Sequence, residues 1–237
     1  MLADITGDST AGRLEREAQL PSTAKHAILD FIARQLPVWR DRPDRPAHHA
    51  EDRLTESLCD HLNSAAYRST DMTNFRFGTE TGDETNAGRT IDLAVKPLGT
   101  TLIIDTRRST IFDTVLPIEC KRLPTPPGTN RDHREYVFNQ HKSTGGMQRF
   151  KRGHHAETHD LAAMVGYVQQ DTCVDWHTRT TQWIDDLIAA KEQGWSKNDH
   201  LRVEHDDARR KVTVLSSKHT RESRPKIELR HLWIEMA

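Results

Sequence analysis

The chain has 237 residues, of which 35% are hydrophobic and 29% charged, and its formal net charge is -1. A charge this close to zero excludes a protein that coats nucleic acid by bulk electrostatics, so any contact with DNA has to be local. No apolar run approaches the roughly 20 residues that a membrane-spanning helix needs, and the polar N-terminal stretch does not resemble a signal peptide. We therefore expect a cytoplasmic protein with no membrane contact.

The residues that bind metals or form disulfides are scattered. Cys59, Cys120 and Cys173 are widely spaced and form no CxxC pair, so neither a zinc knuckle nor a disulfide framework is predicted. The 14 histidines form no HExxH motif, and the sequence has no GxxxxGK[ST] loop and no GxSxG motif. These signatures of zinc proteases, NTPases and serine hydrolases are therefore missing.

Apolar periodicity and turn-forming residues predict an α/β fold with a mixed sheet. A helix over residues 24–36, capped by Ser22 and stopped by Pro37, precedes a charged proline-rich linker, so we divide the chain into a helical arm with linker, residues 1–46, and a main domain, residues 47–237. In chain order, the main domain is expected to contain a helix over 50–66, strands over 74–78, 89–95, 101–105 (a hairpin partner of the preceding strand) and 116–123, a helix over 131–144, a buried strand over 161–168, a helix over 175–193, and strands over 211–217 and 227–235.

Two of these predicted strands carry charged side chains. Because side chains alternate along a strand, Glu119 and Lys121 point to one face, while Ile118 and Cys120 point into the opposite layer. In the strand over 89–95, Asp92 lies on the face opposite to the apolar residues. Pairing of the two strands would bring two carboxylates and an ammonium together on a largely buried sheet, where charges are costly unless they are paired or bound to a metal.

This combination of side chains suits phosphodiester hydrolysis. Two neighbouring carboxylates and the carbonyl oxygen of Cys120 form an all-oxygen site of the kind that Mg²⁺ or Mn²⁺ uses. Lys121 would orient or deprotonate a bound water and offset charge that develops on a phosphate. The alternative is a buried structural ion pair, because a Glu-x-Lys triplet is expected about once by chance in a chain of this length.

The pattern resembles the PD-(D/E)xK nuclease superfamily, the restriction-endonuclease-like enzymes, whose signature is an acid at the end of one strand and Glu-x-Lys on the next. Asp92 stands for the first acid, Glu119 for the second and Lys121 for the lysine, while Ile91 replaces the proline. The resemblance implies a restriction-endonuclease-like core, a central mixed β-sheet flanked by helices. It also implies a Mg²⁺- or Mn²⁺-dependent DNA endonuclease that acts in restriction or anti-phage defence.

The helix over 50–66 supplies a further candidate ligand. Glu51 falls within the arc of its apolar stripe, and in the superfamily the helix before the first core strand often contributes a glutamate to the metal site. The resemblance therefore implies metal ligands at Asp92, Glu119, Cys120 and Glu51. The alternative is that Glu51 only complements the helix dipole in the first turn. Glu80, in the segment before Asp92, is a second candidate.

Basic residues gather after the Glu-x-Lys strand, where superfamily members carry a helix that closes over the site. The segment 145–153 combines glycines, basic side chains and Phe150, a composition that suits contacts with backbone phosphates. A solvated charged face is the alternative. The predicted DNA-binding residues are Arg122, Lys142, Gln148, Arg149, Lys151 and Arg152.

Two other functions stay open. The first is a nuclease-fold DNA-binding or assembly subunit that is inactive, or active only with a partner protein, and the near-neutral charge and the N-terminal helix favour such dependence. The second is a transcriptional or structural α/β module in which the triplet arose by chance. Besides DNA, the expected partners are a second copy of the chain, because restriction-like enzymes often dimerise, or another protein of a defence system.

Overall fold

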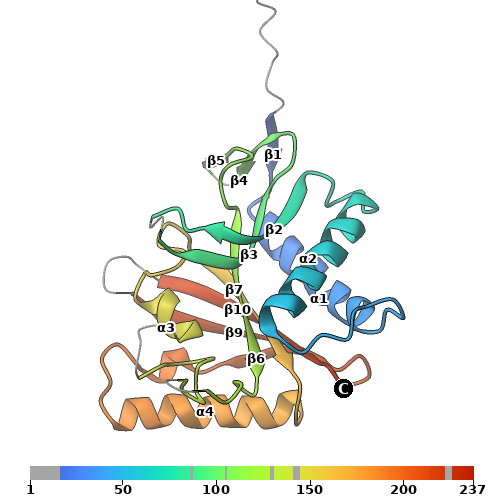
Figure 1. Ribbon diagram of the computed structural model, residues 1–237. Helices are drawn as coiled ribbons and strands as arrows, with labels where there is room; N and C mark the ends of the chain where they lie inside the picture. The colour runs from blue at the N-terminus through green and yellow to red at the C-terminus, as the bar shows by residue number, and fades with distance from the viewer. Residues whose placement is uncertain (1–16, 86–87, 105, 129–130, 141–144, 222–225) are drawn as a thin grey trace, which may run out of the picture.

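The computed structural model describes residues 17–85, 88–104, 106–128, 131–140, 145–221 and 226–237 (Figure 1). Within these residues it has a seven-stranded sheet in the order β2-β3-β6-β7-β10-β9-β8 and a three-stranded sheet in the order β1-β4-β5. The strands are β1 (Glu17–Leu20), β2 (Phe75–Gly82), β3 (Thr90–Pro97), β4 (Thr101–Ile104), β5 (Arg107–Ser109), β6 (Leu116–Leu123), β7 (Leu161–Val168), β8 (Arg202–Asp207), β9 (Val212–Thr220) and β10 (Lys226–Glu235). The helices are α1 (Ala24–Arg40), α2 (Glu51–Tyr67), α3 (Gly146–Lys151), α4 (Cys173–Ala189) and the short 3₁₀ helix η1 (Lys197–Asp199).

The large sheet lies between two helical layers. Helices α1 and α2 pack on one face, and α3 and α4 lie on the other (Figure 1). Strand β7 is parallel to both of its neighbours, β6 and β10, and all eight of its residues are buried. Successive side chains of β7 point to opposite faces of the sheet and enter two hydrophobic cores. Val165 packs in the core with α1 and α2, and Met164 packs in the second core with α3 and α4. The predicted mixed sheet flanked by helices is confirmed.

Close packing explains the glycine inside this central strand. A Cβ atom at Gly166 would collide with the indole ring of Trp233 on the neighbouring strand β10. Trp233 is fully buried, and its Nε1 donates a hydrogen bond of 2.8 Å to the hydroxyl of Tyr136. The glycine therefore makes room for a large aromatic side chain in the second core.

Helix α1 differs from its prediction at both ends. It continues through Pro37 to Arg40, and its N-cap residue is Thr23 instead of Ser22. Leu36 and Trp39, on either side of the proline, are fully buried in the core shared with α2 and the sheet. Burial of these side chains outweighs the loss of one helical hydrogen bond. The buried side chains of α1 therefore pack in the same core as α2 and the sheet.

Strand pairing also departs from the prediction in one place. The strand after the turn at residues 97–100 does not form a hairpin with β3, because both edges of β3 are already paired, with β2 and with β6. Strand β4 pairs instead with β1 and β5 in the small sheet. Strands β1, β5 and β8 were not predicted, since β1 and β5 have only four and three residues and the charged sequence of β8 lacks apolar alternation.

The helix predicted over 131–144 is wrong for the residues that the structure describes there. Residues 133–137 form turns, and residues 141–144 lie outside the described residues. Tyr136, Val137 and Phe138 are consecutive and all buried, which a half-exposed helix does not allow. The carbonyl oxygens of residues 135–137 accept hydrogen bonds from the first N–H groups of α3. This loop thus caps the helix that follows it.

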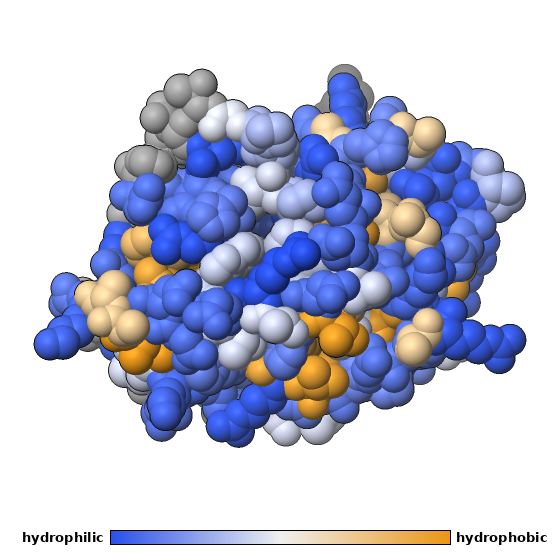
Figure 2. All heavy atoms as spheres, turned by 90° about the horizontal axis from the view of Figure 1, so that it is seen from below, coloured by the Kyte–Doolittle hydropathy of each residue, from blue (hydrophilic) through white to orange (hydrophobic). Residues whose placement is uncertain are grey.

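None of the described helices has the length and apolar character that a bilayer crossing requires. The face seen from below is hydrophilic over most of its area, and its hydrophobic residues lie in small separate groups (Figure 2). Hydrophilic residues therefore dominate this side of the molecule.

Candidate functional site

The candidate site lies where β3 and β6 separate. Backbone pairing between the two strands ends at Leu93 and Ile118, although β6 continues its pairing with β7 as far as Leu123. The register, continued by one residue, sets Asp92 opposite Glu119 on the face that the sequence predicted. Beyond that point, the backbone N–H groups on the β3 side of β6 have no strand to pair with. Side-chain carboxylates accept their hydrogen bonds instead.

Two carboxylates fill this gap from different elements. The Cys120 N–H donates a hydrogen bond of 2.8 Å to Asp92 Oδ2, and the Arg122 N–H donates one of 2.9 Å to Glu51 Oε2. Glu51 is the first residue of α2, so the start of that helix faces the open edge of β6. Because backbone donors hold both carboxylates, their positions follow from the strand itself and not from loop conformation.

Lys121 stands at the centre of the site. Its Nζ lies 3.0 Å from Glu51 Oε1, 3.2 Å from Asp92 Oδ2 and 2.9 Å from Glu119 Oε1. The same ammonium donates a hydrogen bond of 2.8 Å to the carbonyl oxygen of Cys120. The side chains of Lys121 and Glu119 are only 8% and 1% exposed. Three carboxylates from a helix and two strands therefore converge on one buried ammonium.

Arg149, on α3, completes the ion cluster from the other side. Its Nη1 lies 2.5 Å from Glu119 Oε1, and its side chain stays partly exposed. The loop that caps α3 places this helix beside the sheet, and Gly145, the N-cap residue, packs so closely against the backbone of Phe138 that a Cβ atom would not fit. The local fold thus brings Arg149 to the site.

Glu119 and Lys121 differ in how the cluster changes their pKa values. Burial, reinforced by Asp92 and opposed by Lys121 and Arg149, raises the pKa of Glu119 to about 7. Burial alone would lower the pKa of Lys121, but the neighbouring carboxylates outweigh it and hold that pKa well above its ordinary value. Lys121 therefore remains an ammonium near neutral pH, able to donate hydrogen bonds and positive charge but not to take a proton from water.

A pocket of about 530 Å³ opens onto this cluster. Glu51 and Asp92 keep 28% of their side-chain surface exposed towards it, in contrast to Glu119. The pocket is lined by Glu51, Gly88, Arg89, Thr90, Asp92, Lys121, Arg131, Glu135, Arg149, His154 and His155. Three of these lining residues, Arg89, Arg131 and Arg149, are arginines, whose guanidinium groups are suited to hydrogen bonds with phosphate oxygens.

Some residues of this pocket were missed by the sequence analysis. Arg89 and Arg131 line it from the start of β3 and from the capping loop, and the only available signal was the position of Arg89 three residues before Asp92. Burial, reinforced by Arg149, lowers the pKa of His155 to about 4, so its imidazole is neutral near pH 7. Nothing in its sequence context distinguished it from the other histidines.

The donor set fits a hard divalent cation. The carboxylates and the Cys120 carbonyl are oxygen ligands, and Glu119 Oε2 is buried without a hydrogen-bond partner. Within the described part of the chain, however, no three His, Cys, Asp or Glu side chains stand ready-made around a cation position, because the Lys121 ammonium lies among them. Binding a cation therefore requires Lys121 to release part of its contacts.

Two of the predicted DNA-binding residues have structural roles. Gln148 is buried, and its Oε1 accepts hydrogen bonds from the backbone N–H groups of Asn139 and Gly145. Lys151 is buried too, pairs with Asp199, and lies over a tryptophan ring. Since neither side chain reaches the surface, the prediction that they contact DNA does not fit the fold.

The remaining predicted residues occupy varied positions. Arg122 donates a hydrogen bond of 2.8 Å to Gln169, and Arg152 is partly exposed near Glu192. Lys142 lies outside the described residues. Glu80 belongs to β2, is exposed, and does not line the pocket. Among the described members of the predicted DNA-binding set, Arg149 is the one that lines the pocket.

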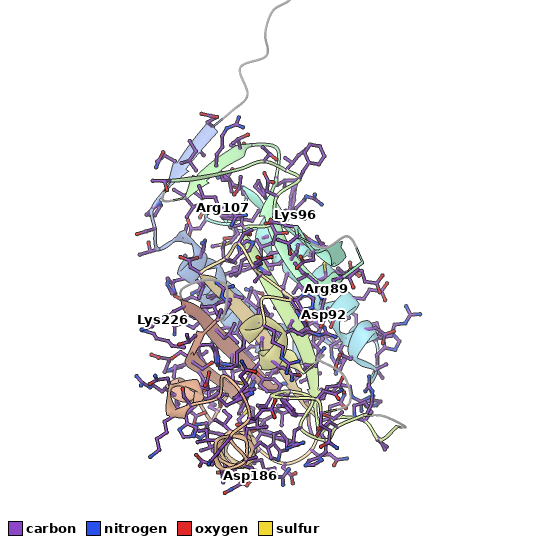
Figure 3. The ribbon with its side chains drawn as sticks, turned by 90° about the vertical axis from the view of Figure 1, so that its left-hand side faces the viewer. Arg89, Asp92, Lys96, Arg107, Asp186 and Lys226 are labelled. Carbon is purple, nitrogen blue, oxygen red and sulfur yellow. The ribbon has the colours of Figure 1, made fainter. Side chains whose placement is uncertain are left out.

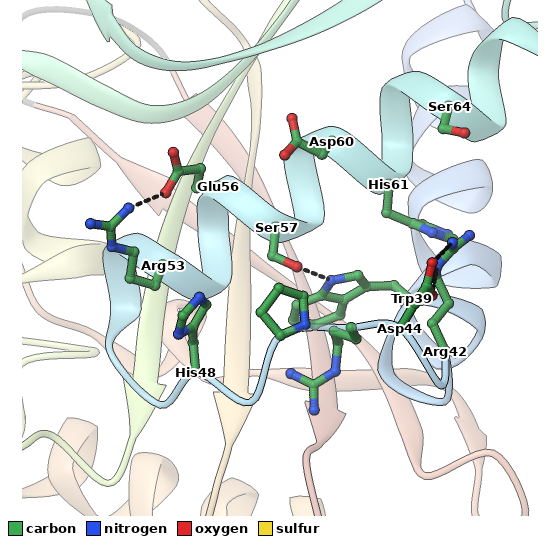
Figure 4. Close-up of a pocket in the computed structure, with 12 residues that line it drawn as sticks. Trp39, Arg42, Asp44, His48, Arg53, Glu56, Ser57, Asp60, His61 and Ser64 are labelled. Carbon is green, nitrogen blue, oxygen red and sulfur yellow. Dashed lines mark hydrogen bonds and ion pairs between the residues drawn. The ribbon is translucent and has the colours of Figure 1, made fainter.

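A second pocket, of about 320 Å³, lies between the end of α1 and the outer side of α2 (Figure 4). Its acids include Glu56, which pairs with Arg53 at 2.9 Å, and Asp60. Glu56 and Asp60 are both exposed, and neither lines the pocket at the carboxylate cluster. This pocket lacks the convergence of carboxylates and lysine seen at Lys121.

Comparisons of the chain with protein-family models, with curated proteins and with solved structures found no match. The arguments about function therefore rest on the geometry and electrostatics of the site.

Proposed function

We propose that this protein is a Mg²⁺- or Mn²⁺-dependent DNA endonuclease with a restriction-endonuclease-like core. The observation that carries the proposal is the convergence of Glu51, Asp92 and Glu119 on Lys121 at the gap between β3 and β6. The acid-acid-lysine set of the PD-(D/E)xK signature and the glutamate of the preceding helix thus meet at one point. A mixed sheet with a helix following the Glu-x-Lys strand is consistent with that type of core.

The residues of the site divide the work as follows. Asp92, Glu119 and Glu51, with the Cys120 carbonyl, would hold the cation. When bound, a divalent cation activates water and offsets charge on a phosphate. Lys121 donates hydrogen bonds and positive charge at the reacting phosphate.

The arginines of the pocket would bind the phosphates on either side of the phosphodiester that is cut. Arg89, Arg131 and Arg149 line the pocket beside the carboxylates and would bind phosphate oxygens of the DNA backbone. The resemblance to the superfamily adds to this proposal a role in restriction or anti-phage defence in the cytoplasm. The partner would be a second copy of the chain or another defence protein.

The charge of the cluster favours a functional role over a structural one. Three carboxylates face two cations, Lys121 and Arg149, so one negative charge is in surplus when all are ionised. Glu51 and Asp92 are partly exposed towards the pocket, so a cation bound there would offset this surplus charge. A site that binds a divalent cation needs such a surplus of negative charge.

A second function is favoured by a separate observation. Lys121 and Arg149 already occupy the carboxylates in the free chain. A nuclease-fold subunit that is inactive, or active only after a partner protein or DNA rearranges these contacts, would have this arrangement. Calorimetric titration with Mn²⁺ tests for a working metal site, since a degenerate site would bind none.

Cleavage assays test the proposal. Wild-type protein, Asp92→Asn and the control Asp60→Asn, an exposed acid on α2, are incubated with supercoiled plasmid, linear duplex and single-stranded DNA in Mg²⁺, Mn²⁺ or EDTA. We expect metal-dependent cutting by the wild type and the control and none by Asp92→Asn. Cutting by Asp92→Asn at the wild-type rate would contradict the assignment. No cutting by the wild type, with Mn²⁺ binding intact, would favour the partner-dependent subunit.

A further inference from the structure

Two cations face each other across β2 and β3. Arg76 and Lys96 are directly opposite in the register of these strands, an arrangement that costs stability because like charges repel. Burial, reinforced by Arg76 and opposed by the carboxylates of Glu84 and Asp113, lowers the pKa of Lys96. Each cation donates its hydrogen bond to a backbone carbonyl, and neither forms an ion pair with a residue that the structure describes. An anionic ligand would relieve this repulsion.

These hydrogen bonds hold a loop that carries an exposed aromatic ring. Arg76 Nη2 donates a hydrogen bond of 3.0 Å to the carbonyl oxygen of Ile111, and Lys96 Nζ donates one of 3.2 Å to the carbonyl oxygen of Phe112. The Asp113 carboxylate accepts two hydrogen bonds from Thr110 and closes the turn. The Phe112 side chain is 80% exposed. The loop is thus fixed by its backbone while its ring faces solvent, a placement with no benefit to folding.

The same strand connects this surface to the carboxylate cluster. Asp92 and Lys96 are four residues apart on one face of β3, which is about 13 Å at the rise of a strand. Lys96 lies on the side of the molecule that also carries Asp92 and Arg89 (Figure 3). A distance of about 13 Å corresponds to a few nucleotides along a DNA strand.

We propose that Arg76, Lys96 and Phe112 form a basic-aromatic strip that binds an unpaired stretch of DNA next to the phosphodiester at the carboxylate cluster. The inference rests on the proposed function and adds the form of the substrate. Phosphates pair with the two cations, and a base stacks on the Phe112 ring, which requires a base face that a closed duplex does not offer. The substrate is therefore a single strand, or a duplex with a single-stranded flank.

Binding in EDTA, where no cutting occurs, tests the strip apart from catalysis. Fluorescence anisotropy of a labelled single-stranded oligonucleotide is measured with wild type, Phe112→Ala, Arg76→Ala and Lys96→Gln. The controls are Val174→Ala, a 65% exposed apolar residue on α4, and Arg202→Ala, an exposed arginine on β8 at the far edge of the sheet. Thermal unfolding of each variant verifies its fold.

The general energetics of base stacking and of phosphate contacts set the size of the expected effects. Loss of base stacking in Phe112→Ala should weaken binding by about 5- to 150-fold. Arg76→Ala and Lys96→Gln should each reduce the slope of log affinity against log salt by about 0.7. The controls should bind as the wild type does.

The outcomes distinguish the strip from the nuclease proposal. Weakened binding in the three variants but not in the controls supports the strip, even if no cutting is ever found, in which case the nuclease proposal alone fails. Wild-type affinity in all three folded variants overturns the strip, even if cutting at the carboxylate cluster is demonstrated. A wild type that does not bind the single strand, or binds a blunt duplex more tightly, overturns it as well.

Discussion

Replacing Glu119 by glutamine should make the protein more stable at neutral and alkaline pH while abolishing the proposed activity. Burial raises the pKa of Glu119 in the folded chain to about 7, from an ordinary value of 4.5. A carboxyl whose pKa is raised by folding favours the folded state below pH 4.5 and loses that contribution as pH rises towards 7. A shift of this size corresponds to about 3 kcal/mol.

Glutamine keeps the shape of the side chain and never ionises. Glu119→Gln should therefore match the wild type near pH 4.5 and exceed its free energy of unfolding by up to about 3 kcal/mol above pH 7. Contacts that Lys121 retains with Glu51 and Asp92 preserve the rest of the cluster. Such a gain in stability with loss of activity is typical of functional sites.

Urea unfolding followed by tryptophan fluorescence over pH 4.5 to 8.5 measures this difference. Glu56→Gln, which removes an acid on the exposed side of α2, is the matched control and should change little at any pH. If Glu119→Gln is less stable than the wild type at pH 8, the carboxylate serves the fold as a structural ion pair. The reasoning from charge surplus and burial would then be refuted.

Two further substitutions test the surroundings of the site. Asp199→Asn breaks buried contacts with Lys151 and His219 beneath α3 and should cost about 3–5 kcal/mol in urea unfolding; a loss below 1 kcal/mol would contradict a paired buried charge. Burial alone would raise the pKa of Glu84, but contacts with His159 and other donors hold it at about 2. Glu84→Gln should therefore destabilise the protein above pH 4.5 by about 1–3 kcal/mol, with the difference vanishing as pH falls towards 2. An equal cost at all pH values would be evidence against ionisation as the cause.

The candidate site was largely predictable because it depends on alternation. Glu119 and Lys121 share a face of one short strand, and Asp92 projects from its neighbour, so period-two geometry alone brings them together once the strands pair. Glu51 required a helical wheel and the resemblance to a family. The structure then adds what no pattern showed, namely that the ladder between β3 and β6 ends beside these residues and that backbone donors fix Asp92 and Glu51.

The failures of prediction were tertiary in origin. Pro37 ends an isolated helix, but burial of Leu36 and Trp39 carries α1 past it. The choice of partner for β4 depended on whether β3 still had a free edge, which local sequence does not reveal. Lys151 and Gln148 lie in a basic segment, yet they turn inward to a carboxylate and to backbone donors. Charge composition does not indicate which side of a helix is buried.

The most direct test of the central claim is the rate at which supercoiled plasmid is nicked in Mn²⁺ by wild type, Lys121→Ala and the control Lys218→Ala. Lys218 is an exposed lysine on β9, away from the carboxylate cluster. We expect the wild type and the control to cut at equal rates and Lys121→Ala to cut at least about 100-fold more slowly. Equal cutting by wild type and Lys121→Ala would contradict the claim that the carboxylates gathered on this lysine form a nuclease centre.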